Sequence, residues 1–143
     1  MARLLKYSKT RFIGVFSSDN IPACNSFHSY PCCLIANTDP LGTTGSHWVA
    51  FYYPKYQGQV EFFDSYGLSF DTYHFNIHYH ISSSNTASLQ SIHSNVCGYY
   101  CLFFLYYRSH SQSLKSIVSI IQNLGTHKDM DKYVKSIIIH LLA

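Results

Sequence analysis

The first part of the chain contains short apolar runs separated by polar, turn-forming residues. Phe12–Phe16 is one such apolar segment. The β-branched and aromatic content of the later runs predicts strands over Cys32–Asn37, His47–Tyr53 and Val60–Asp64. A polar segment with Gly58 separates the last two strands, and this arrangement suits an antiparallel hairpin.

The pattern changes to helical spacing after the serine-rich stretch Ser82–Ser94, which we interpret as a loop. Cys97–Tyr107 is almost wholly apolar, so we predict a central, buried helix. Ser113–Leu124 and Asp131–Leu142 carry apolar residues on one face and predict two amphipathic helices, the first ended by Gly125. Strands followed by helices indicate an α+β fold.

The segment between the strands and the loop is harder to assign. Thr72–Ile81 alternates between apolar and polar residues, which would place His74, His78 and His80 on one face of a strand. Such a row is weakly suggestive of a metal site, and a solvated strand face is the more ordinary interpretation. We therefore assign no metal ligands and expect no cofactor.

Composition limits the class of protein. With 47% hydrophobic and 12% charged residues over 143 residues, we expect one folded domain, residues 1–143, in which residues 1–11 form a flexible basic lead-in. The apolar runs are too short to span a bilayer, and the lead-in lacks the apolar core of a signal peptide. Five cysteines without a CxxC pair favour free thiols in a reducing, intracellular compartment. A net charge of +3 is a weak indication of nucleic-acid binding.

Cys97 stands where a polar loop enters the buried helix. A thiol at a helix N-terminus faces unpaired backbone N–H groups and the positive end of the helix dipole, and both favour the thiolate. Cys97 is thus a candidate nucleophile, although a free cysteine is more often a small core residue. The other four cysteines, among them Cys101 one turn further along the helix, are interpreted as structural.

The hairpin supplies partners for a nucleophile. Antiparallel pairing of the two strands would bring His47, at the start of one, beside Asp64, at the end of the other. A carboxylate beside an imidazole fixes its tautomer and stabilises its charged form. His93, in the loop before Cys97, remains a competing base.

Two further residues have candidate roles. The side-chain amide of Gln90 could point at a substrate carbonyl oxygen, with the backbone N–H of Cys97 as a second donor. Trp48 could pack in the core, shield the contact between His47 and Asp64 from water, or do both.

Four ordered motifs resemble those of adenain-like cysteine proteases, in the clan that includes the SUMO-processing Ulp proteases. They are GSHWVAF around His47, FFDSYG around Asp64, LQS around Gln90 and NVCGYYC around Cys97. The upstream sequence NTDP fits the adenain-like branch, and the closest likeness is to maturation proteases of Maverick/Polinton transposons and related viruses.

The resemblance implies a papain-like, adenain-type fold, with a small mixed sheet against the helix that carries the nucleophile. It implies Cys97 as nucleophile, His47 as general base and acid, Asp64 as the orienting acid and Gln90 in the oxyanion hole. It also implies a monomer that cuts capsid or polyprotein precursors near glycine, in the host cytoplasm or nucleus or in the virion. An activating peptide or DNA is implied as well. The chain has Asp64 where adenoviral enzymes have Glu, and it has no cysteine between Cys33 and Cys97 for a disulfide-linked activator.

Two alternatives stay open. An isopeptidase for a ubiquitin-like modifier would use the same four residues. A non-catalytic module that binds an extended peptide or DNA would keep the fold, but it has no need of a polarised thiol.

Overall fold

A mixed sheet and three helices make up the fold in the computed structural model, which describes residues 1–42, 46–55 and 58–143. The strand order is β1-β2-β3-β4-β5, and the strands are β1 (Arg11–Phe16), β2 (Cys32–Asn37), β3 (Trp48–Tyr53), β4 (Glu61–Phe63) and β5 (Ser83–Ser84). The central pairs β2–β3 and β3–β4 are antiparallel, whereas the edge pairs β1–β2 and β4–β5 are parallel. The predicted α+β class and mixed sheet are confirmed.

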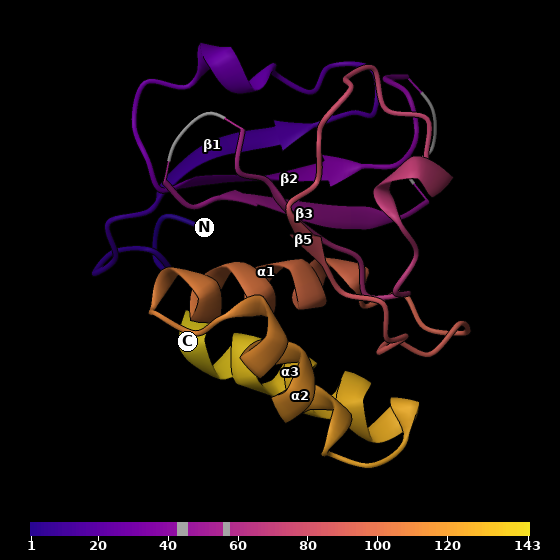
Figure 1. The fold of residues 1–143 in the computed structure, drawn as a ribbon. Coiled ribbons are helices and arrows are strands. Elements are labelled where there is room, and N and C mark those ends of the chain that lie inside the picture. The colour runs from indigo at the N-terminus through magenta and orange to yellow at the C-terminus, as the bar shows by residue number, and fades with distance from the viewer. Residues whose placement is uncertain (43–45, 56–57) are drawn as a thin grey trace.

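The three helices lie on one side of the sheet, with α1 (Cys97–Ser109) next to it and α2 (Leu114–Gln122) and α3 (His127–Leu142) beyond α1 (Figure 1). The alternating residues of β2 and β3 that face α1 form one core cluster with the apolar faces of the helices. Phe63 of β4 stacks on Phe104 of α1, with 4.7 Å between ring centroids. Helix α1 is therefore covered by the sheet on one side and by helices on the other, as its uniform apolar sequence predicts.

In the described part of the chain, the opposite face of the sheet is covered by loops and short 3-10 helices rather than by α-helices. The segment after the short 3-10 helix η2 (Phe70–Thr72) lays its odd-numbered aromatic and aliphatic residues on this face. His74, His78 and His80 alternate with them and are exposed. The alternation seen in the sequence is present, but the strand considered there does not form, because residues 73–81 pack against the sheet face without joining its ladder.

Two elements differ from the sequence analysis by more than a residue or two at their ends. Residues of the predicted loop Ser82–Ser94 include β5, which pairs with β4. Helix α3 begins four residues before the predicted Asp131, because Thr126 caps it and forms a reciprocal capping box with Asp129. The loop glycine expected before His47, Gly45, lies outside the described residues, as does part of the hairpin connection at 56–57.

The basic lead-in is held to the fold rather than loose. Leu4 and Leu5 are buried, and the Arg3 guanidinium donates to the backbone carbonyl of Leu142 at the far end of the chain. Of the helices in the described part of the chain, none is long and apolar enough to cross a membrane.

The turn after β4 requires glycine at Gly67. Its φ is +73°, and a Cβ there would lie 2.6 Å from the backbone of Ala87.

We expect Gly67→Ala to lower the free energy of unfolding by more than about 1 kcal/mol, because the clash is with backbone that cannot move aside. Urea unfolding measures this. Gly98→Ala is the matched control: a Cβ there meets no described atom within 4 Å, so stability should be kept or raised. An equal effect of both substitutions would contradict this account.

Candidate active site

The register of β3 and β4 brings the predicted base and acid together. Phe63 pairs with Ala50 across the hairpin, so the residue before β3 meets the residues after β4. His47 Nε2 lies 2.6 Å from Asp64 Oδ1, and Asp64 is completely buried. The contact deduced from strand pairing alone is present.

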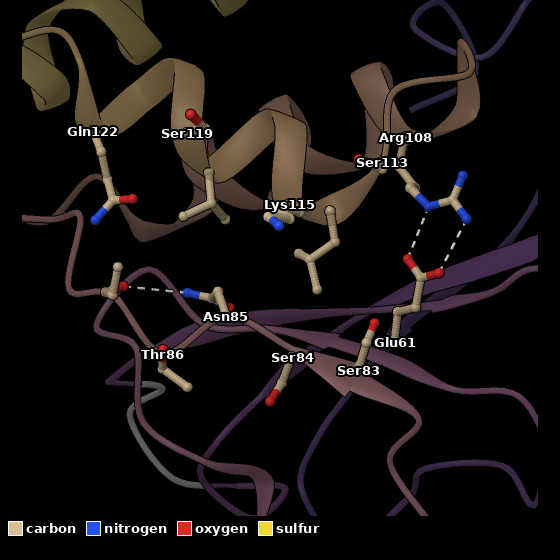
Figure 2. A pocket seen from close by; sticks show the side chains of 13 residues that line it. Glu61, Ser83, Ser84, Asn85, Thr86, Arg108, Ser113, Lys115, Ser119 and Gln122 are labelled. Carbon is tan, nitrogen blue, oxygen red and sulfur yellow. Dashed lines mark hydrogen bonds and ion pairs between the residues drawn. The ribbon is translucent and has the colours of Figure 1, made fainter.

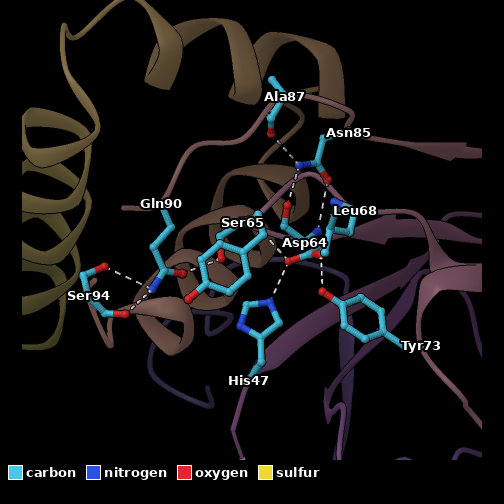
Figure 3. A network of polar contacts seen from close by, with 10 residues as sticks. His47, Asp64, Ser65, Leu68, Tyr73, Asn85, Ala87, Gln90 and Ser94 are labelled. Atoms are coloured by element: carbon cyan, nitrogen blue, oxygen red, sulfur yellow. Dashed lines mark hydrogen bonds and ion pairs between the residues drawn. The ribbon is translucent and has the colours of Figure 1, made fainter. Parts of the chain in front are cut away.

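The Asp64 carboxylate is held on every side. Its Oδ1 also accepts from the Tyr66 backbone N–H at 2.9 Å, and its Oδ2 accepts from the Tyr73 hydroxyl at 2.6 Å and the Leu68 N–H at 3.3 Å (Figure 3). Asn85 bonds both the backbone N–H of Asp64, at 3.0 Å, and its carbonyl, at 2.6 Å. These donors hold the carboxylate in one orientation, with Oδ1 aimed at the imidazole.

With Nε2 committed to Asp64, the other ring nitrogen of His47 is left for the nucleophile. Nδ1 is buried and has no hydrogen bond of ordinary geometry to the described residues, but the ring interacts with the Cys97 thiol. Cys97 begins α1 and is 7% exposed, and His47 is 6% exposed. His93, the competing base, lies exposed in the loop before α1.

The two groups shift each other toward an ion pair. Burial lowers the pKa of His47, but the hydrogen bond to Asp64, the interaction with the Cys97 thiol and the negative charges of both groups outweigh it and raise that pKa to about 9. Burial also raises the pKa of Cys97, but His47 and the backbone N–H groups of Trp48 and Gly98 outweigh it, so the pKa of the thiol is lowered. At neutral pH both shifts favour thiolate and imidazolium.

The pKa values of the other four thiols are shifted in the opposite direction, upward. Burial raises the pKa of Cys32 to about 11 and that of Cys33 to about 12, and it also raises the pKa of Cys24 and Cys101. All five cysteines are free. Cys97 is thus the thiol that its surroundings activate.

Gln90 is fully buried, and both the oxygen and the nitrogen of its side-chain amide are hydrogen-bonded. Its Oε1 accepts from the Ser65 hydroxyl at 2.6 Å, and its Nε2 lies 3.0 Å from the carbonyl oxygen and 3.1 Å from the hydroxyl of Ser94 (Figure 3). The loop before α1 is also tied to the helices, because the Ser91 backbone N–H donates to Asp131 of α3 at 3.4 Å, and the same carboxylate accepts from the Tyr100 hydroxyl of α1 at 2.8 Å. The amide therefore has one position beside the start of α1.

Several residues of this site escaped the sequence analysis. Tyr66 stacks on the His47 ring, with 4.4 Å between centroids, so it covers a face of the imidazole. Tyr73, Asn85 and Ser65 act through hydrogen bonds that depend on turns, for which residue spacing gives no signal. Of these residues, Ser65 and Tyr66 lie within the FFDSYG motif that the sequence analysis singled out around Asp64.

Trp48 faces a shallow apolar depression beside the thiol. This depression, of about 510 Å³, is lined by residues of β1 to β3, the first turns of α1 and the end of α3, among them Val15, Trp48, Gly98, Tyr99 and Leu142.

A larger depression, of about 720 Å³, lies between β5 and α2. Figure 2 shows its polar lining, with the Arg108 guanidinium paired to Glu61 through bonds of 2.8 and 3.0 Å. Asn85, which holds Asp64, lies on the wall of this depression. A search for the functional site by depression volume alone would have favoured this depression over the surroundings of Cys97.

In the part of the chain that the structure describes, no group of three or more His, Cys, Asp or Glu side chains is arranged to hold a metal ion. The hypothetical site at His74, His78 and His80 rested on a strand that does not form.

Comparison with known proteins agrees with this geometry. The family model of the adenovirus endoprotease matches residues 12–141. The chain belongs to this family. It is an adenain-like cysteine protease, and the predicted family resemblance is confirmed.

Two relatives illustrate the likeness. A protease of Porcine adenovirus A serotype 3 is 26% identical over 149 aligned positions, which cover 89% of this chain and 72% of the adenoviral one. A crystal structure of an ASFV protease is similar with a TM-score of 0.48 and 22% identity, over 73% of this chain. The match spans 42% of the ASFV chain, so this chain covers less than half of that protease.

The thiol pKa shifts predict selective alkylation. At pH ~6–7, iodoacetamide should modify Cys97 at least about tenfold faster than any other cysteine, because the pKa of Cys97 is lowered whereas that of each of the other four thiols is raised. His47→Ala should remove the advantage, since it removes the charge that stabilises the thiolate. Peptide mass mapping after timed quenching measures each site. Equal rates at all cysteines in the wild-type protein would exclude the ion pair.

Proposed function

We propose that this protease is a thiol endopeptidase in which Cys97 is the nucleophile and His47 the general base and acid. Asp64 orients the imidazole, and Gln90 with the backbone N–H of Cys97 forms the oxyanion hole. The observation that carries the proposal is the buried contact of 2.6 Å between His47 and Asp64, made beside a thiol whose pKa is lowered.

The proposed reaction uses each group in turn. The Cys97 thiolate attacks the scissile carbonyl, and the oxygen of the tetrahedral intermediate takes up the negative charge. The His47 imidazolium protonates the leaving amine as the C–N bond breaks, which leaves a thioester on Cys97. Neutral His47 then accepts a proton from water, and the hydroxide attacks the thioester. The acid is released and the thiolate and imidazolium are restored.

The proposed substrates are precursor proteins of a virus or a virus-like transposon, cut in an extended segment that contains glycine. The low exposure of both reacting residues supports this: Cys97 is 7% and His47 is 6% exposed, so only a slender chain reaches the thiol. Glycine presents no side chain to the walls of such a site. An isopeptide bond to a ubiquitin-like tail that ends in glycine would also satisfy this limit, so the isopeptidase is the second candidate.

Cleavage assays separate these candidates. Wild-type protein and Cys97→Ala are incubated with a panel of glycine-containing peptides and with a fusion to the mature tail of a ubiquitin-like modifier. Parallel reactions contain added DNA or capsid-derived peptides as activators. We expect cleavage of peptides by the wild type, and loss of at least about a thousandfold in kcat in the variant, since it lacks the nucleophile.

Three results would count against the endopeptidase. Cleavage of the fusion alone would favour the modifier isopeptidase. Equal cleavage by Cys97→Ala would remove Cys97 from the mechanism. No cleavage under any activating condition, with Cys97 still selectively alkylated, would favour a binding module.

A further inference from the structure

The hydrogen-bond network determines which way the Gln90 amide faces. The Ser94 carbonyl oxygen can only accept, so the Gln90 nitrogen must lie on its side, at 3.0 Å. The amide oxygen therefore faces Ser65, whose hydroxyl donates to it at 2.6 Å (Figure 3). If the amide were turned over, two oxygens would face each other at Ser94 and the Ser65 hydroxyl would meet N–H groups.

Ser65 also fixes the backbone that carries Gln90. Its carbonyl oxygen accepts from the N–H of Leu89 at 2.8 Å and from that of Gln90 at 3.0 Å. Ser65 is 1% exposed and Gln90 is fully buried, so solvent does not compete for these bonds. Ser65 directly follows Asp64, so the same turn holds both the orienting acid and the amide.

We propose that Ser65 is a positioning residue for the oxyanion hole: its hydroxyl keeps the nitrogen of the Gln90 amide aimed toward the reacting carbonyl. The inference rests on the oxyanion role proposed above for Gln90. Ser65 is too deeply buried to contact the substrate, so it acts through Gln90.

The same network indicates what happens when the intermediate forms. Both Gln90 N–H groups are engaged with Ser94, one acceptor being its carbonyl and the other its hydroxyl. The Ser94 hydroxyl in turn donates to the Ser91 carbonyl at 3.0 Å. The substrate oxyanion replaces the Ser94 hydroxyl as acceptor of one Gln90 N–H hydrogen bond, because a charged acceptor competes better than a neutral one. The bond to the Ser94 carbonyl remains and holds the amide in place.

A double-mutant cycle tests the proposal. On a cleaved peptide, Gln90→Ala should lower kcat by about a hundredfold, as expected for loss of one oxyanion donor. Ser65→Ala should lower kcat by roughly tenfold with KM little changed. The double variant should be no slower than Gln90→Ala, because Ser65 has nothing left to position. The pH dependence of Cys97 alkylation should stay as in the wild type, since the ion pair is not involved. Ser69→Ala, an exposed serine in the same region, is the matched control and should keep wild-type kcat.

The outcomes separate the two claims. Wild-type kcat in Gln90→Ala would refute the oxyanion role itself. A slow Gln90→Ala with a fully active Ser65→Ala would refute only the positioning role. Multiplied losses in the double variant, or a shifted alkylation profile, would show that Ser65 acts by another route, such as through Asp64.

A second pair guards against misfolding of Ser65→Ala. Ser65→Thr and Ser65→Val have nearly the same shape and differ in the hydroxyl, so the steric cost of the added methyl group is common to both. We expect the threonine variant to be about tenfold faster than the valine variant. Equal kcat values in this pair would overturn the proposal.

Discussion

The hydrogen bond between His47 and Asp64 is the interaction on which the site depends, and the pairing of β3 with β4 creates it. Each residue lies immediately outside its strand, so the register that pairs Ala50 with Phe63 also sets the distance between imidazole and carboxylate. A one-residue slip would turn the alternating side chains of a strand to the opposite face. Burial of one face of each strand therefore fixes the register, and the register fixes the contact between His47 and Asp64.

Helix α1 places the proposed nucleophile, Cys97, beside this hairpin. Its buried body is packed between the sheet and the other helices, which holds Cys97, at its first turn, in a fixed place beside His47. Burial alone would favour the neutral thiol and the neutral imidazole. The two pKa shifts favour the ion pair because Asp64, the attraction between His47 and Cys97, and the backbone N–H groups around the thiol more than offset that cost. Removal of Asp64 would thus raise the pKa of the Cys97 thiol, because it would weaken the positive charge on His47.

Strand pairing and helix entry could be predicted from the sequence because they follow from periodicity: His47, Asp64 and Cys97 stand at element ends that the pattern defines. The alternation around His74, His78 and His80 did not decide whether a strand forms, because alternation records which side chains are buried and not whether the backbone joins a ladder. The start of α3 was placed too late because its first turn is polar. Ser65 and Tyr73 were missed since they act through turns, where spacing does not encode which side chains meet.

The most direct test of the central claim is an NMR titration of the His47 ring, using ¹⁵N-labelled histidine and the His47→Ala variant to assign its resonances. The account predicts that His47 carries a proton on both ring nitrogens at pH 7 and loses one with a midpoint near 9, well above the ordinary value of 6.5. Protonation is favoured below that midpoint because Asp64 and the thiolate both stabilise the charge. A neutral imidazole at pH 7, with a midpoint at or below 6.5, would contradict the ion pair and the mechanism built on it.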